Sequence, residues 1–181
     1  LATAIKRAVV AGVIETNVTK TIATLRVPTT EQKVKAYSQA DAQTIIDRAK
    51  TESEKRMLTF LFYSGIRHGE FAALRREDVE LPFVTIRRNI SRQGAPSLPK
   101  TKSSTRTIRL PKQAEIALSE QLSSHSHENV WLNSSGYPYK SSIIITYRRW
   151  DEIVEGLDKL TPYATRHSFC SWVVQSGENL M

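Results

Sequence analysis

Three basic residues lie where the predicted secondary structure changes, and their side chains could bind a common anion. Arg67 follows Gly65 at the end of an apolar stretch, Lys100 lies in a basic loop, and Arg166 lies at the start of the last predicted helix. Two guanidinium groups can hold the non-bridging oxygens of one phosphate through paired hydrogen bonds, and a helix start adds backbone N–H groups. A lysine on an exposed loop could approach a bridging oxygen and donate a proton to it. These residue types therefore indicate chemistry at a phosphate group.

Arg67 is the most informative of the three because it ends one of the most apolar stretches of the chain, residues 57–66. A guanidinium keeps its charge in a protein, so burying it is costly unless an anion compensates it. That anion could be a bound phosphate or a carboxylate of the chain itself, such as Glu70 or Asp78. The residue types alone favour the carboxylate, and Glu70 suits a structural partner better than a reactive acid.

The chain is strongly basic, with 26 Lys and Arg residues against 18 Asp and Glu residues, a net charge of +8 and a pI of about 9.7. That balance favours a polyanionic partner such as nucleic acid, although a soluble basic protein without such a partner would show the same balance. The length of 181 residues suits one good-sized domain or one domain with a fragment of another, and 40% hydrophobic residues lie in the globular range and argue against disorder.

Cysteine and histidine usage argues against disulfides and metal sites. Cys170 is the only cysteine, which excludes a disulfide within the chain and a zinc cluster, so we expect a reducing compartment, the cytoplasm. His125 and His127 have polar surroundings without further ligands, so a solvated turn is predicted there in place of a metal site. No apolar run reaches the length of a transmembrane helix, and no membrane partner is expected.

The candidate residues need elements that position them, and the first half of the chain predicts helices. Ser38 suits an N-cap, with Asp41 three residues later, before a helix with one apolar face. A helix over residues 53–63 is apolar on nearly all sides, which predicts a central position. Gly65 ends this helix, and a short helix over residues 68–74 follows directly.

Strand patterns come next. Residues 79–81, 83–87 and 105–110 are typical of strands, and the last segment alternates with period two. A basic loop over residues 89–104 lies between the second and third strands. The pattern predicts a small antiparallel sheet with a long exposed hairpin, in an α+β domain that is mainly α-helical.

Helices are predicted again in the rest of the chain, over residues 112–122, over residues 141–157 and after Pro162. The second of these has apolar residues in helical register: Ile143, Tyr147, Trp150 and Val154. The helix after Pro162 carries Trp172, and both Trp150 and Trp172 are predicted to lie in the core.

Three segments of the chain resemble the tyrosine recombinases, the phage-integrase family. Residues 62–70 with 74–79 resemble the first arginine box of that family, residues 99–108 its β-hairpin lysine motif, and residues 163–169 its second box, usually His-x-x-Arg-His. All three occur in the family's order, and the resemblance implies a tyrosine-recombinase-like catalytic core.

The resemblance also divides the chain into parts. Residues 1–27 resemble the last helix of the family's N-terminal core-binding domain and the start of a linker, residues 28–36 continue the linker, and residues 37–181 form the catalytic domain. The chain contains six tyrosines, none of them after Arg166, whereas the family's nucleophilic tyrosine follows the second box. We therefore expect a C-terminally incomplete catalytic domain, a fragment of a longer protein that does not cleave DNA strands by itself.

The family's reaction gives each candidate residue a role. A tyrosine attacks a DNA backbone phosphate, giving a 3′-phosphotyrosyl enzyme and a free 5′-hydroxyl, with no metal and no other cofactor. The resemblance assigns Arg67 and Arg166 to a phosphate clamp and Lys100 to protonation of the leaving oxygen, a role for which Lys102 competes. Lys102 and Arg106 are expected to contact DNA, and a solvated surface role for Arg106 is nearly as good an interpretation.

Tyr163 departs from the family's pattern because it stands where a histidine is usual. A phenol can donate a hydrogen bond to a phosphate but is a poor base near neutral pH. We expect Tyr163 to position the phosphate in the catalytic site, with a core aromatic as the alternative. His167 is expected to pack or to form hydrogen bonds.

The resemblance implies that the parent protein is a site-specific DNA recombinase or integrase of a phage or mobile element, acting as a tetramer on double-stranded DNA. The alternative is a non-catalytic DNA-binding or regulatory protein with the same fold. A third possibility is a related enzyme that relaxes supercoils by the same transesterification.

Overall fold

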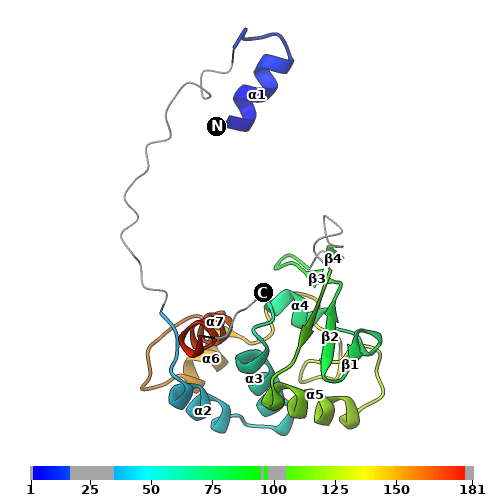
Figure 1. Cartoon of the computed structure of the whole chain (residues 1–181), viewed down its shortest axis with the longest axis vertical. Helices are drawn as coiled ribbons and strands as arrows, with labels where there is room; N and C mark the ends of the chain where they lie inside the picture. Colours follow the sequence, from blue (N-terminus) through cyan, green and yellow to red (C-terminus); the bar gives the residue numbers. More distant parts are fainter. Residues whose placement is uncertain (1, 17–34, 95, 98–104, 178–181) are drawn as a thin grey trace. The chain divides into compact units, whose positions relative to one another are not determined.

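The chain forms two compact units, residues 1–33 and residues 34–181, both drawn in Figure 1. The computed structural model describes residues 2–16, 35–94, 96–97 and 105–177. The first unit contains helix α1 (Ala2–Val10), and Gly12 follows it with a left-handed backbone at φ 69°. A glycine in this conformation is a common helix end.

The second unit is mainly helical and carries a small antiparallel sheet along one side (Figure 1). Its helices are α2 (Gln39–Asp47), α3 (Glu52–Ser64), α4 (His68–Ala72), α5 (Lys112–Ser124), α6 (Tyr147–Ile153) and α7 (Ala164–Ser176), with a short 3-10 helix, η2, over Arg76–Asp78. The predicted α+β class is confirmed. Among the described residues, no helix combines the length and the apolar character needed to cross a bilayer.

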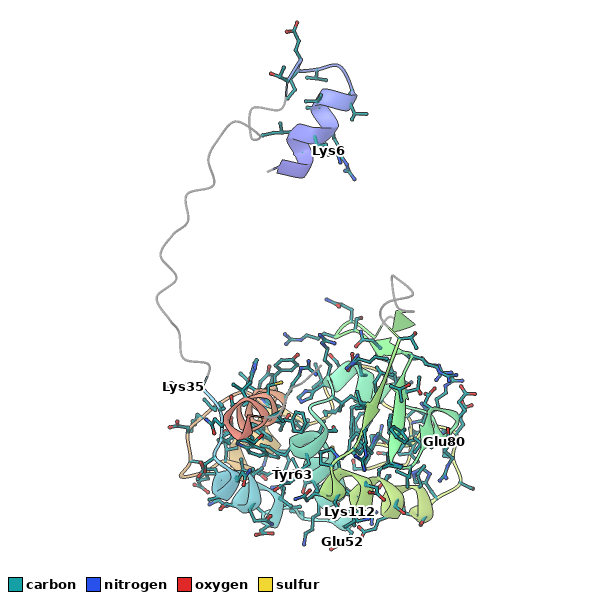
Figure 2. All side chains as sticks on the ribbon, in the orientation of Figure 1. Lys6, Lys35, Glu52, Tyr63, Glu80 and Lys112 are labelled. Atoms are coloured by element: carbon teal, nitrogen blue, oxygen red, sulfur yellow. The ribbon has the colours of Figure 1, made fainter. Side chains whose placement is uncertain are left out.

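Helix α3 lies at the centre of this unit and packs against α2, α5 and α7 (Figure 1). Phe60 and Phe62 of α3 are fully buried, which explains why this helix is apolar on nearly all sides. Figure 2 shows the side chains of the unit, with Glu52 and Lys112 at the first residues of α3 and α5. The predicted central helix is therefore confirmed.

The start of α2 agrees with the capping residues in the sequence. The Ser38 hydroxyl accepts a hydrogen bond from the Asp41 backbone N–H at 3.1 Å, and the Asp41 carboxylate accepts one from the Ser38 N–H at 3.2 Å. This reciprocal pair satisfies two N–H groups that have no partner inside the helix.

The sheet has three antiparallel strands in the order β1 (Val79–Glu80), β2 (Phe83–Ile86) and β5 (Arg106–Arg109). Val84 of β2 is fully buried and pairs with Ile108 of β5. Within the predicted basic loop, β3 (Asn89–Ile90) and β4 (Pro96–Ser97) pair as a second, two-stranded sheet. The hairpin therefore begins with regular strand pairing that composition alone did not predict.

The predicted helix over residues 141–157 is wrong at both ends, and most of all in its first part, because α6 spans only Tyr147–Ile153. Residues 143–145 are three consecutive isoleucines, and β-branched side chains lose rotamer freedom in a helix. The Thr146 hydroxyl then accepts a hydrogen bond from the Arg149 backbone N–H at 3.3 Å. Threonine is a favourable N-cap, so the helix begins after it.

This later start changes which side chains reach the core. Trp150 and Val154 are buried as predicted, whereas Ile143 and Tyr147 are 44% and 56% exposed. Trp172 of α7 is partly buried, and its ring stacks on Phe62 with centroids 6.1 Å apart. The expected apolar face is therefore present only within and after α6.

Candidate functional site

The corner between α3 and α4 carries Arg67, and Gly65 shapes it. Gly65 ends α3 with a left-handed backbone at φ 60°. A Cβ atom at this position would lie 2.3 Å from the Phe169 ring of α7, so another residue type fits only if that ring or the backbone shifts. The glycine therefore gives both the sharp turn and the close contact between the two arginine-bearing segments.

The start of α7 reaches the same corner through hydrogen bonds. Arg166 Nη1 donates to the carbonyl oxygen of Gly65. His68 Nε2 lies 3.4 Å from the Thr165 hydroxyl, and the His68 and Tyr163 rings meet edge to face with centroids 5.6 Å apart. The structure thus brings the first and second arginine boxes into direct contact.

Arg67 itself is paired with a carboxylate of its own helix. Its Nη1 donates to Glu70 Oε1 at 3.0 Å, and its backbone N–H donates to Glu70 Oε2, also at 3.0 Å. The Arg67 side chain is 52% exposed, whereas that of Glu70 is 7% exposed. The sequence suggested a buried arginine, but the buried charge is that of Glu70, and about half of the Arg67 side chain is open to solvent.

Glu70 has a second cationic partner on strand β5. Arg106 donates from Nη1 to Oε1 at 2.9 Å and from Nη2 to Oε2 at 2.8 Å, a bidentate pair. Burial alone would raise the pKa of Glu70, but the hydrogen bonds from Arg106 and from the Arg67 backbone outweigh burial, and the pKa is lowered. The Glu70 hydrogen bond in turn raises the pKa of Arg67, with a smaller contribution from Tyr163.

His68 is a neutral group in this corner. Burial lowers its pKa to about 4, and a hydrogen bond with the Pro162 backbone opposes this shift only in part. Near neutral pH the imidazole is therefore uncharged, and the fixed positive charge at the corner comes from the arginines.

Tyr163 lies at the surface beside a small cavity of about 190 Å³ lined by His68, Arg92, Tyr147 and Pro162, among others. Its side chain is 37% exposed, and its ring meets His167 edge to face at 5.1 Å. A larger hollow of about 520 Å³ lies along residues 36–39 and 171–176, and the described residues that line it are uncharged. The smaller cavity is the one that adjoins the arginine boxes.

Two of the predicted site residues, Lys100 and Lys102, lie outside the described residues. Of the others, Arg67, Tyr163 and Arg166 belong to the two segments that meet at the α3–α4 corner, and Arg106 reaches the corner from β5.

Sequence analysis missed the bond between Arg106 and Glu70. The period-two pattern held a signal for it, since Arg106 shares the half-buried face of β5 with Ile108.

The two histidines that could suggest a metal site serve in backbone turns. His127 Nδ1 accepts from the Asn129 N–H at 2.9 Å, and His125 Nε2 lies 3.1 Å from the Val130 carbonyl oxygen. Within the part of the chain that the structure describes, no three His, Cys, Asp or Glu side chains gather closely enough to hold a metal ion.

Comparison with known proteins identifies the family. The family model described as the phage integrase family matches residues 11–181. The chain belongs to the phage integrase family. This confirms the resemblance that the arginine boxes and the hairpin motif indicate.

Curated relatives of the chain include two recombination proteins. Prophage integrase IntR of Escherichia coli (strain K12) is 31% identical over 171 residues, which cover 78% of this chain and 41% of IntR. Tyrosine recombinase XerD of Chlorobaculum tepidum is 25% identical over 130 residues, which cover 70% of this chain and 41% of XerD. The chain thus spans about two fifths of the length of these relatives.

Solved structures of the family share the fold at low identity. The Tn1549 transposon integrase in complex with transposon right end DNA superimposes with a TM-score of 0.75 at 18% identity, over 98% of this chain and 65% of that chain. A lambda integrase tetramer bound to a Holliday junction gives a TM-score of 0.64 at 12% identity, over 98% of this chain and 53% of that chain. These matches confirm the predicted tyrosine-recombinase-like fold.

Proposed function

We propose that the whole protein is a site-specific DNA recombinase or integrase that cleaves and rejoins DNA strands through a 3′-phosphotyrosyl intermediate. Arg67 and Arg166 bind the scissile phosphate in this reaction. The observation that carries the proposal is the hydrogen bond from Arg166 to the Gly65 carbonyl oxygen, because it joins the two arginine boxes of a phage integrase family chain at one corner.

The chemistry requires fixed positive charge at this corner. When a nucleophile attacks a phosphodiester, negative charge develops on the non-bridging oxygens, and donors already aimed there lower the barrier. Arginine suits this task because it stays protonated and can form two parallel hydrogen bonds to phosphate. The half-exposed side chain of Arg67 and the partly buried Arg166 leave side-chain surface for such a ligand.

Two residues outside the described part complete the proposal. Lys100 donates a proton to the leaving 5′-oxygen, with Lys102 as the competing candidate, and Lys102 also contacts the DNA backbone. Both lie in the sequence between β4 and β5, and the charge of a lysine ammonium suits each task.

Tyr163 positions the phosphate by donating a hydrogen bond from its phenol. Its exposure at the edge of the cavity and its contribution to the raised pKa of Arg67 support a place beside the clamp. A phenol does not exchange protons readily near neutral pH, so a positioning role fits its chemistry.

Double-stranded DNA is the proposed partner, and the net charge of +8 supports it. The tetramer that lambda integrase forms on a Holliday junction supports a tetramer for the whole protein on DNA. The reaction needs no nucleotide cofactor, because the phosphotyrosyl bond conserves the energy of the phosphodiester. It needs no metal, because the arginines supply the positive charge at the phosphate and a lysine supplies the proton for the leaving oxygen. A chain with one cysteine suits the reducing cytoplasm.

The test uses the whole protein and DNA selected by binding to it. Covalent protein–DNA adducts are counted after denaturation for the wild type, for Arg67→Ala and for Arg166→Ala. Removing one such contact costs about 3–4 kcal/mol of transition-state stabilisation, so each variant should form adducts about 100- to 1,000-fold more slowly.

Arg109→Ala serves as the matched control, since Arg109 is an exposed arginine on β5 and should leave the adduct rate unchanged. Undiminished adduct formation by Arg67→Ala would remove this residue from the mechanism. A wild-type protein that binds DNA but forms no adduct would favour the non-catalytic DNA-binding alternative.

A further inference from the structure

The Glu70 carboxylate is a junction between two arginines that come from different elements. Arg106 of β5 contacts both oxygens, at 2.9 and 2.8 Å, and Arg67 contacts both oxygens through its side chain and its backbone, each at 3.0 Å. An ionised carboxylate has about four lone-pair positions, so these four hydrogen bonds saturate it. The carboxylate side chain is 7% exposed, which leaves little room for water to replace a lost partner.

We propose that Arg106 is a positioning residue, which acts through Glu70 to hold the guanidinium of Arg67 in place for phosphate binding. This inference rests on the proposed function of Arg67. It also gives Arg106 a task different from the DNA contact that the sequence predicts, because both of its Nη atoms already bind a buried carboxylate.

The geometry explains how Arg106 constrains Arg67. Arg106 occupies one position on each carboxylate oxygen, so the Arg67 side chain is limited to a single Nη1 contact with Oε1. Without Arg106, the buried charge of Glu70 would lack half of its hydrogen bonds, and Arg67 would be the nearest cation able to supply them. Arg67 would then turn from the solvent-facing side of the corner toward Glu70.

The same bond couples the hairpin to the corner. Arg106 is the first residue of β5 and pairs with Ile86 of β2, so its backbone is fixed by the sheet. A second close contact supports this coupling, because a Cβ atom on Gly69 of α4 would lie 2.3 Å from the Ile90 carbonyl oxygen of β3. Both ends of the hairpin are therefore held against the short helix that follows Arg67.

A positioning role and a phosphate contact predict different behaviour. A lost phosphate contact weakens DNA binding and lowers the slope of log affinity against log salt by about one. A lost positioning contact leaves affinity and slope nearly unchanged but slows the reaction at saturating DNA, since displacement of a catalytic group by about 1 Å can cost about 100-fold.

The experiment compares Arg106→Gln, Arg106→Lys and Arg109→Gln in the whole protein. We expect adduct formation at saturating DNA to fall by about 10- to 100-fold in Arg106→Gln, with an unchanged salt slope, and to stay at the wild-type rate in Arg109→Gln. Arg106→Lys should fail to restore the rate, because an ammonium cannot form the bidentate pair. Arg106→Lys keeps the charge and therefore tests the inference if Arg106→Gln does not fold.

The pH profile gives a further readout. Arg106 helps to keep the pKa of Glu70 low, so removing it lets Glu70 take up a proton at a higher pH. The acid limb of the adduct rate should therefore move to higher pH in Arg106→Gln but not in Arg109→Gln. Equal rates and pH profiles in these two variants would overturn the inference, and so would a smaller salt slope with an unchanged rate at saturation.

Failure of the proposed function is recognised separately, by wild-type protein that forms no adduct. In that case the side-chain N–H resonance of Arg67 is followed by NMR in the 181-residue chain. Arg106→Gln should shift this resonance and Arg109→Gln should not. An Arg67 resonance unaffected by Arg106→Gln would contradict the positioning role whatever the activity of the protein.

Discussion

Two arginine-bearing turns of the second unit use their guanidinium groups in different ways. Arg76 donates to three backbone carbonyls: from Nε to His127 at 2.9 Å, and from Nη2 to Leu122 at 2.6 Å and to His125. Arg67 binds one carboxylate of its own helix and remains 52% exposed. The first turn thus consumes its donors inside the protein, whereas the second keeps donors at the surface.

The difference separates structural from functional arginines in a chain that is rich in both. Leu122 lies in the last turn of α5 and His125 is its C-cap, so Arg76 satisfies carbonyls that have no partner inside the helix. A cation there also compensates the negative end of the helix dipole. Among the described residues, Arg67 donates to no carbonyl of another helix, and its partner Glu70 has Arg106 as a second cation. The groups that accept the guanidinium hydrogen bonds, more than position in the sequence, distinguish the structural arginine from the functional one.

The largest expected effect on stability contrasts these two arginines directly. Arg76→Ala leaves three carbonyls without a charged donor and should lower the free energy of unfolding by about 3–4 kcal/mol. Arg67→Ala should lower it by only about 1–2 kcal/mol, because the buried Glu70 carboxylate loses one of its four hydrogen bonds and keeps the bidentate pair with Arg106. Urea denaturation of the 181-residue chain measures both. Similar losses in the two variants would break the comparison.

A pH titration tests how tightly the Arg67 corner is packed. His68 has a pKa of about 4 in the folded chain against an ordinary value of 6.5, so folding favours its neutral form. Its contribution to stability is complete above pH 6.5 and is lost as the pH falls toward 4. The difference between these two pKa values corresponds to at most about 3–4 kcal/mol of stability.

His68→Gln is the control for this titration, since glutamine does not titrate. Thermal unfolding followed by circular dichroism should show the wild type losing more stability than His68→Gln between pH 6.5 and 4.5. The window stops there because the lowered pKa of Glu70 contributes a loss of its own below the ordinary value of 4.5. Parallel curves for the two proteins would mean that His68 is hydrated in the folded chain.

A smaller effect is expected at the contact that joins the two boxes. Gly65→Ala places a methyl group against the Phe169 ring and should lower the free energy of unfolding by about 2 kcal/mol. Gly136→Ala is the matched control, because Gly136 also has a positive φ, 79°, but has no atom within 4 Å of an added Cβ. The cost at Gly136 should be only the backbone strain of about 1 kcal/mol. Equal losses in the free energy of unfolding at both glycines would show that the Phe169 ring of α7 does not restrict the space at Gly65.

Much of the local structure was predictable because it depends on neighbouring residues. The capping pair of Ser38 and Asp41, the stop at Gly65 and the apolar helix between them all follow from local chemistry, and the structure agrees. The segment before α6 was predicted wrongly, since apolar residues at helical spacing masked the β-branched run at 143–145 and the cap at Thr146.

The candidate site was only partly predictable, because it combines local motifs with distant contacts. The motifs at Arg67 and Arg166 identified the segments, and the family comparison agrees with them. The partner of Glu70 on β5 lies 36 residues away, and the hydrogen bond from Arg166 to Gly65 spans 101 residues. Such contacts depend on strand register and helix packing, which no short pattern specifies.

The sequence by itself determined the helix boundaries at Ser38 and Gly65, the basic charge of the chain and its membership of the phage integrase family. Only the tertiary structure decided that Glu70, and not Arg67, carries the buried charge, and that Arg106 shares it. The physical reason is that burial is a property of the packed chain. The Glu70 carboxylate loses its hydrating water only when α4 and β5 pack around it. The arginines that then donate hydrogen bonds to it are those that the packing places within reach.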